Sequence, residues 1–187
     1  MACLLSLGMQ AQSVFRFAQL TDLHLSPNNP NPTEDLLRSV AQINATDNID
    51  FVLVTGDITE EGDRATMEKV KSCLDLLKVK YYVALGNHET KWSDSGCTAF
   101  GEIFGSERFE FEHKGFLFLG FNSGPLMRMA YGHVVPQDIR WMTERMEQAG
   151  KDKPVILVTH YPLKDGDVDN WYEVTDAVRP YNVRLFI

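Results

Sequence analysis

The sequence predicts an α/β (α+β) fold in which helices cover mixed sheets. Its apolar segments alternate between short runs typical of strands and longer stretches with apolar residues three and four apart, typical of helices. Alternating strand and helix patterns favour layers of helices packed on a sheet. The 187 residues, 44% of them hydrophobic, suffice for one compact domain and are too few to argue for two.

In the first half of the chain, strands are expected at residues 14–20, 51–55 and 80–85. The second of these is a continuous apolar run, which is typical of a strand buried on both faces. Thr33 is expected to cap a helix that carries Leu36, Val40 and Ile43 on one face. A second helix is expected from about residue 63 to residue 77, because its apolar residues recur every three or four positions.

The second half of the chain begins with a polar segment that includes a short predicted helix at residues 98–104. Two short strands then flank a hairpin turn at residues 112–115. Pro136 is expected to open a helix that stops at Gly150, since proline suits a first turn and glycine a helix end. Strands at residues 155–159 and 183–187 complete the pattern.

Four short polar motifs each follow an apolar run: Asp22-Leu23-His24, Gly56-Asp57, Gly86-Asn87-His88-Glu89 and Thr159-His160. Ligands of α/β sheets bind outside the carboxyl ends of the strands, so these motifs are expected to converge. Taken singly, each residue is also explained as an ordinary turn residue. Four such motifs in order at four strand ends favour a shared site.

The donor atoms of these motifs suit two divalent cations. Asp22 and His24 lie two residues apart, so both side chains can face one cation. Asp57 can bridge two cations through its two oxygens, and Asn87 and His160 can serve the second. Oxygen and nitrogen donors without thiolate favour manganese, iron or zinc over calcium. Two cations and two carboxylates leave a charge of about +2, which would attract a phosphate ester.

This ordered set of motifs resembles the calcineurin-like metallophosphoesterase family, from about residue 15 to residue 187. The resemblance implies a four-layer sandwich of mixed sheets flanked by helices. It also implies a binuclear centre that hydrolyses phosphate mono- or diesters with water activated by the two metals. The motifs are most similar to those of the bacterial branch that includes cyclic-nucleotide phosphodiesterases and general phosphohydrolases.

His88 follows Asn87, an expected metal ligand, but need not bind a metal itself. It is therefore expected to protonate the leaving oxygen as a general acid, a role that the resemblance also implies. A neighbouring carboxylate would orient its ring and raise its pKa. Glu60 and Glu89 are the candidates, and Glu60 is preferred because related phosphatases carry an acid three residues past the bridging aspartate, here Asp57.

Two other branches of the family are disfavoured. Purple acid phosphatases carry a tyrosine where Glu60 stands, and serine/threonine phosphatases carry an arginine where Glu61 stands. The family also closes its site with a Gly-His-x-His motif that does not occur before Ile187. We therefore expect a C-terminally truncated domain with weak metal binding and little activity. The alternative is a non-catalytic fragment that serves as an interaction domain of a larger protein.

Residues 1–12 are expected to be the remnant of a secretory signal peptide, and residues 13–187 the metallophosphoesterase domain. The apolar segment before Ala11 is typical of the central region of such a signal, although a basic start is missing. The segment is too short to span a membrane. Export to the periplasm or the medium is therefore favoured over a cytoplasmic location.

Composition limits the partners. With a net charge of −8 and no basic run, the chain is not expected to bind a nucleic-acid backbone. Cys3, Cys73 and Cys97 are odd in number and lack metal spacing, which disfavours disulfides and a cysteine zinc site. His113 and His133 are expected in an exposed hairpin and a loop. The expected partner is a small-molecule or nucleotide phosphate ester, and no oligomeric state is indicated.

Overall fold

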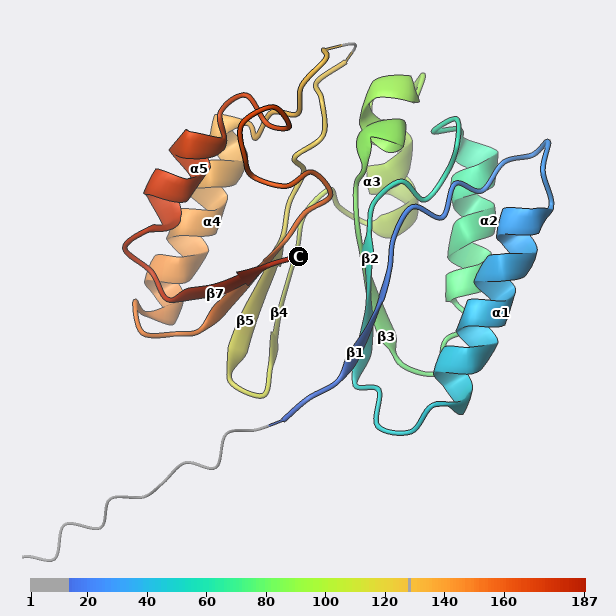
Figure 1. Ribbon diagram of the computed structural model, residues 1–187, viewed down its shortest axis with the longest axis horizontal. Helices are drawn as coiled ribbons and strands as arrows, with labels where there is room; N and C mark the ends of the chain where they lie inside the picture. The colour runs from blue at the N-terminus through green and yellow to red at the C-terminus, as the bar shows by residue number, and fades with distance from the viewer. Residues whose placement is uncertain (1–13, 128) are drawn as a thin grey trace, which may run out of the picture.

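The computed structural model describes residues 14–127 and 129–187. Two sheets face each other and helices cover both outer faces, which gives four layers (Figure 1). The predicted α/β class and sandwich architecture are therefore confirmed. The predicted signal remnant at residues 1–12 lies outside the described residues. Within them, no helix combines the length and apolar character needed to cross a membrane.

The first sheet is parallel and has the strand order β1 (Phe17–Leu20), β2 (Phe51–Thr55), β3 (Lys80–Ala84). Parallel neighbours need crossover connections, and α1 (Asn31–Ala45) and α2 (Arg64–Leu74) provide them on the outer face (Figure 1). The central strand β2 is buried along its whole length, as its apolar run predicts. The Asp63 side chain caps α2 by accepting a 2.9 Å hydrogen bond from the Thr66 N–H.

The start of α1 differs from the prediction. Thr33 is buried inside the helix and does not cap it, while Pro30 occupies the capping position and Pro32 lies in the first turn. Proline has the backbone angle that a helix start requires and lacks an N–H that would otherwise go unpaired there. Proline geometry, and not a side-chain cap, therefore marks where this helix begins.

The second sheet is mixed and has the order β4 (Phe109–His113), β5 (Phe116–Gly120), β6 (Val155–Val158), β7 (Val183–Phe186). Its outer face is covered by α4 (Pro136–Ala149) and α5 (Trp171–Val178) (Figure 1). The sequence pattern did not predict α5, which has only eight residues and buries Val174 and Val178. Two short helices lie between the sheets in sequence: a π-helix, η1 (His88–Trp92), and α3 (Thr98–Phe104).

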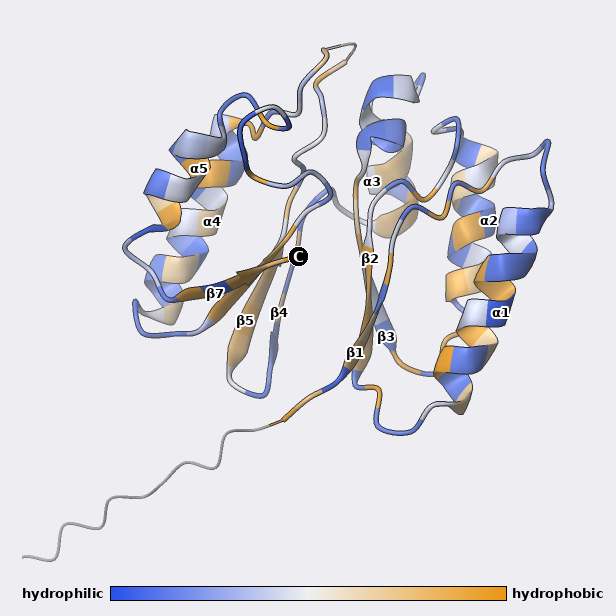
Figure 2. Ribbon diagram, viewed as in Figure 1, coloured by the Kyte–Doolittle hydropathy of each residue, from blue (hydrophilic) through white to orange (hydrophobic). Residues whose placement is uncertain are grey.

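Aromatic rings fill the space between the two sheets, and the facing strands β2 and β5 are largely apolar (Figure 2). The Phe51 ring lies 5.4 Å from that of Phe17 in its own sheet and 5.2 Å from that of Phe118 in β5. Such offset and edge-on pairs add to the stabilisation from buried area. His113, expected to be exposed, is partly buried because its ring packs edge-on against Phe51 and Phe15. The two sheets are thus held together by a packed aromatic layer.

Replacing Phe51, which is 2% exposed, by alanine should lower the free energy of unfolding by about 3–5 kcal/mol. The physical reason is the cavity that the missing ring leaves between the sheets. Chemical denaturation measures the change. Leu76→Ala is the control, because Leu76 is 58% exposed and its truncation should cost about 0.5 kcal/mol or less. Similar losses in the two variants would contradict the packing described.

Candidate metal centre

The predicted site residues converge at the carboxyl ends of strands from both sheets. Asp22 and His24 follow β1, Asp57 follows β2, Asn87 and His88 follow β3, and His160 follows β6. The Oδ2 atom of Asp57 lies 3.9 Å from Nε2 of His24, 3.9 Å from Nε2 of His88 and 3.3 Å from Nε2 of His160. One carboxylate oxygen is therefore faced by three imidazole nitrogens that come from three different strands.

Backbone hydrogen bonds continue the strand pairing past the ends of β1 and β2. The Asp22 N–H donates to the Gly56 carbonyl at 3.1 Å, and the His24 N–H donates to the Asp57 carbonyl at 3.0 Å. The loop after β3 joins them, because the His88 N–H donates to Asp57 Oδ1 at 3.0 Å. Three separate loops are thus hydrogen-bonded to one another.

Three of the predicted metal ligands have a left-handed backbone. The φ angle is +54° at Asp22, +46° at His24 and +50° at Asp57. Residues with side chains rarely adopt this region, and they persist there only when the surrounding structure imposes it. Here the cross-loop hydrogen bonds impose it, so backbone strain is concentrated at the residues expected to bind metal.

Two glycines let these loops approach one another closely. Gly56 has φ +94°, and a Cβ built on it would lie 2.7 Å from the His160 ring. A Cβ at Gly86 would lie 2.1 Å from Oδ1 of Asp57. Both distances are far shorter than any real contact of a Cβ atom. The Gly-Asp and Gly-Asn-His motifs therefore both need their glycines for space, and Gly56 is also needed for its left-handed backbone conformation.

Asp57 and His160 stabilise each other's charged forms. Burial raises the pKa of the Asp57 carboxyl, but hydrogen bonds from His160 and from the His88 N–H outweigh burial and hold the pKa below its ordinary value. Burial lowers the pKa of His160, but the Asp57 carboxylate outweighs it and holds the pKa above its ordinary value. His160 Nδ1 lies 2.8 Å from the Thr55 carbonyl, to which it must donate. Nε2 is therefore the atom left to bind a metal.

Glu60 contacts two histidines through different groups. Its carboxylate lies 3.0 Å from Nδ1 of His24, where the angle is poor for a hydrogen bond. Its main-chain carbonyl instead accepts from Nδ1 of His88. The structure thus places the carboxylate, which the sequence suggested as a partner of His88, against His24. In both histidines Nδ1 faces Glu60 and Nε2 faces the carboxylate of Asp57.

Glu89 joins the loops after β2 and β3 through buried hydrogen bonds, a role that the sequence did not predict. It is fully buried, and its Oε1 accepts hydrogen bonds from the N–H and the hydroxyl of Thr59, at 3.0 and 2.9 Å. Its Oε2 accepts from the Gly86 N–H at 3.0 Å. Burial raises the pKa of Glu89, although these donors oppose the shift. The only sequence signal was an acid three residues past Gly86, the glycine that follows β3.

The donor set fits the divalent cations expected from the sequence. Asp22, His24 and Asp57 offer donor atoms within 4.8 Å of one another, and so do His24, Glu60 and His88. Asn87 is half-buried between the end of β3 and His88. Carboxylate oxygens and imidazole nitrogens at this spacing suit first-row divalent metals. The two groups share His24.

Comparison with known proteins gives a consistent result. A family model described as calcineurin-like phosphoesterase matches residues 15–187. A 3′,5′-cyclic-nucleotide phosphodiesterase of Nostoc sp. is 24% identical over 153 residues, which cover 78% of this chain and 56% of that protein. A probable glycerophosphodiester phosphodiesterase of Arcobacter nitrofigilis is 26% identical over 134 residues, which cover 65% and 46%. The chain spans about half the length of these curated relatives.

Glu60→Gln should weaken the binding of Mn²⁺ by about 10- to 100-fold, because it removes the negative charge that lies 3.0 Å from Nδ1 of His24. Isothermal titration calorimetry measures the affinity. Glu61→Gln is the matched control, since it removes the same charge from the neighbouring exposed position. An equal loss of affinity in both variants would assign the effect to net charge and not to the orientation of His24.

Glu89→Gln should lower the free energy of unfolding by about 1–3 kcal/mol although the two side chains have the same shape. The carboxylate accepts from three donors, whereas the amide turns an N–H toward one of them. Thermal and urea unfolding report the loss. Glu144→Gln, on the exposed face of α4, should leave the stability unchanged. An unchanged stability in Glu89→Gln would show that the buried contacts contribute little.

Proposed function

The chain belongs to the calcineurin-like phosphoesterase family, and we propose that it hydrolyses phosphate diesters with two divalent cations and with His88 as general acid. One observation carries the proposal: a buried carboxylate, Asp57, faces the Nε2 atoms of three histidines at 3.3 to 3.9 Å. Histidines converge in this way on a metal site or a catalytic site more readily than in a structural core, where each would need its own partner.

In this proposal Asp22 and His24 hold one cation, Asn87 and His160 hold the other, and Asp57 bridges them. Manganese, iron or zinc would polarise the phosphate and lower the pKa of the attacking water. The chain's own contribution is orientation. The Thr55 carbonyl accepts a hydrogen bond from His160, and the Glu60 carboxylate lies 3.0 Å from Nδ1 of His24, so that both histidines present Nε2.

His88 is well placed to transfer a proton. Because its Nδ1 donates to the Glu60 carbonyl, the proton given to the substrate must come from Nε2. Nε2 lies on the same side as Asp57, and the side chain is mostly buried, which excludes bulk water from the transfer. When the phosphorus–oxygen bond breaks, this proton neutralises the leaving oxygen.

A diester is preferred over a monoester as the substrate. The relatives named above as phosphodiesterases support this choice.

With Mn²⁺ added, the protein should hydrolyse bis(p-nitrophenyl) phosphate faster than p-nitrophenyl phosphate. His88→Ala should lower kcat by about 10²- to 10⁴-fold for a diester with a poor leaving group, and by less for p-nitrophenyl esters, whose leaving oxygen needs little protonation. Metal content, measured by mass spectrometry, should be retained in that variant.

His160→Ala is the matched histidine variant and should lose bound metal along with activity. Loss of metal in His88→Ala would make His88 a ligand and remove it as the acid. Binding of metal without hydrolysis of either ester would overturn the enzymatic proposal and favour the non-catalytic interaction domain.

A further inference from the structure

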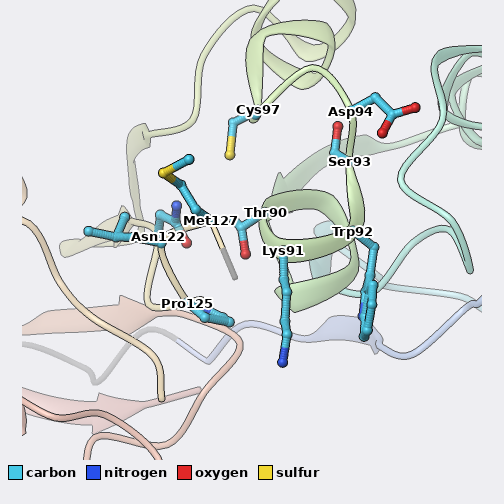
Figure 3. Close-up of a pocket in the computed structure, with 11 residues that line it drawn as sticks. Thr90, Lys91, Trp92, Ser93, Asp94, Cys97, Asn122, Pro125 and Met127 are labelled. Atoms are coloured by element: carbon cyan, nitrogen blue, oxygen red, sulfur yellow. The ribbon is translucent and has the colours of Figure 1, made fainter. Parts of the chain in front are cut away.

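A cleft of about 710 Å³ is lined in part by η1, the helix that begins at His88. The π-helix η1 forms one wall, from which Lys91 and Trp92 extend in the same direction, and the facing segment carries Asn122, Pro125 and Met127 (Figure 3). A volume of this size is typical of small-molecule sites. The cleft is therefore large enough for an organic group well beyond the phosphate itself.

The cleft and the proposed general acid His88 share the helix η1. His88 and Trp92 are the first and last residues of η1, and their ring centroids lie 6.4 Å apart. The His88 ring in turn lies 4.6 Å from that of His24. A general acid must contact the leaving oxygen, so the leaving alcohol begins at His88. The Trp92 ring, 6.4 Å from that of His88, is within reach of a group attached to this oxygen.

The walls of the cleft suit a flat, polarisable group. Trp92 is 55% exposed and Met127 is 83% exposed, although both are large apolar side chains. Exposed apolar groups gathered at one hollow mark binding surfaces, and indole and thioether groups both favour aromatic partners. The Lys91 ammonium lies 5.3 Å from the centre of the Trp92 ring and adds a cation that attracts the face of an aromatic ring.

We propose that this cleft binds a planar aromatic ring carried by the leaving alcohol, and that Trp92 selects for that ring. The inference rests on the proposed phosphodiesterase function, which places the leaving group at His88. In the reaction, a water oxygen forms a bond to phosphorus, the bond from phosphorus to the leaving oxygen breaks, and His88 supplies the proton that this oxygen takes up. An aryl group and a nucleobase share the required flat π face.

The test compares methyl phenyl phosphate with methyl 2-naphthyl phosphate, whose leaving groups are similar in acidity and differ in ring area. The wild type should prefer the naphthyl ester in kcat/KM. Trp92→Ala should reduce that preference by about three- to tenfold, and Trp92→Phe should keep part of it. Tyr172→Ala removes an exposed aromatic ring from α5, outside the cleft, and should change nothing.

A second arm uses 3′,5′-cyclic adenosine monophosphate, in which the ring is a nucleobase. If Trp92→Ala loses only the preference for the naphthyl ester, the ring is an aryl group; if it loses only kcat/KM for the cyclic nucleotide, the ring is a nucleobase. If neither quantity changes, the proposal is overturned. Should the wild type hydrolyse none of these esters, the proposed function fails separately. Calorimetric binding of the two methyl esters then decides the matter: a naphthyl preference lost in Trp92→Ala supports the cleft, and equal affinities in the wild type overturn it.

Discussion

The carboxylate of Asp57 is the group on which the rest of the site depends. It receives the His88 N–H on one oxygen and faces the Nε2 atom of His160, from the other sheet, on the second. Because it is buried, its interactions act in a medium where charges are weakly screened, and they are correspondingly strong. Its position at the end of the fully buried β2 strand gives this charge a rigid support. A shift of this one side chain would disturb loops after β1, β3 and β6 together.

The geometry of the site also depends on the packing between the two sheets. His160 belongs to the second sheet, yet its Nδ1 donates to the Thr55 carbonyl at the end of β2 in the first. That contact requires the sheets to keep a fixed separation and alignment, which the aromatic layer around Phe51 and Phe118 provides. Close-packed interiors are hardly compressible, so a change in this layer would be transmitted to the site. The proposed chemistry is thus supported by a core that contributes no reactive group.

Most of the strands, the layered class and the convergence of the polar motifs could be predicted, because apolar periodicity and strand-end position are local signals. Contacts between distant segments could not. Glu60 stands three residues past Asp57, but only the folded loops show that its carboxylate meets His24 and its carbonyl meets His88. Glu89 looked like a second candidate for orienting His88, and its burial beneath Thr59 is visible only in three dimensions. The short helix α5 has too few turns for its periodicity to stand out.

The close packing around Gly56 and Gly86 limits which positions of this protein can be varied. Gly56 and Gly86 adjoin His160 and Asp57 so closely that even alanine would displace a proposed ligand. The wall of the cleft is different, since Trp92 and Met127 are exposed and border open space. A directed-evolution library that varies the cleft wall should therefore keep many folded members, whereas one that varies the glycine turns should lose most of them. New shapes of the cleft are more accessible in this scaffold than new arrangements of the proposed metal ligands.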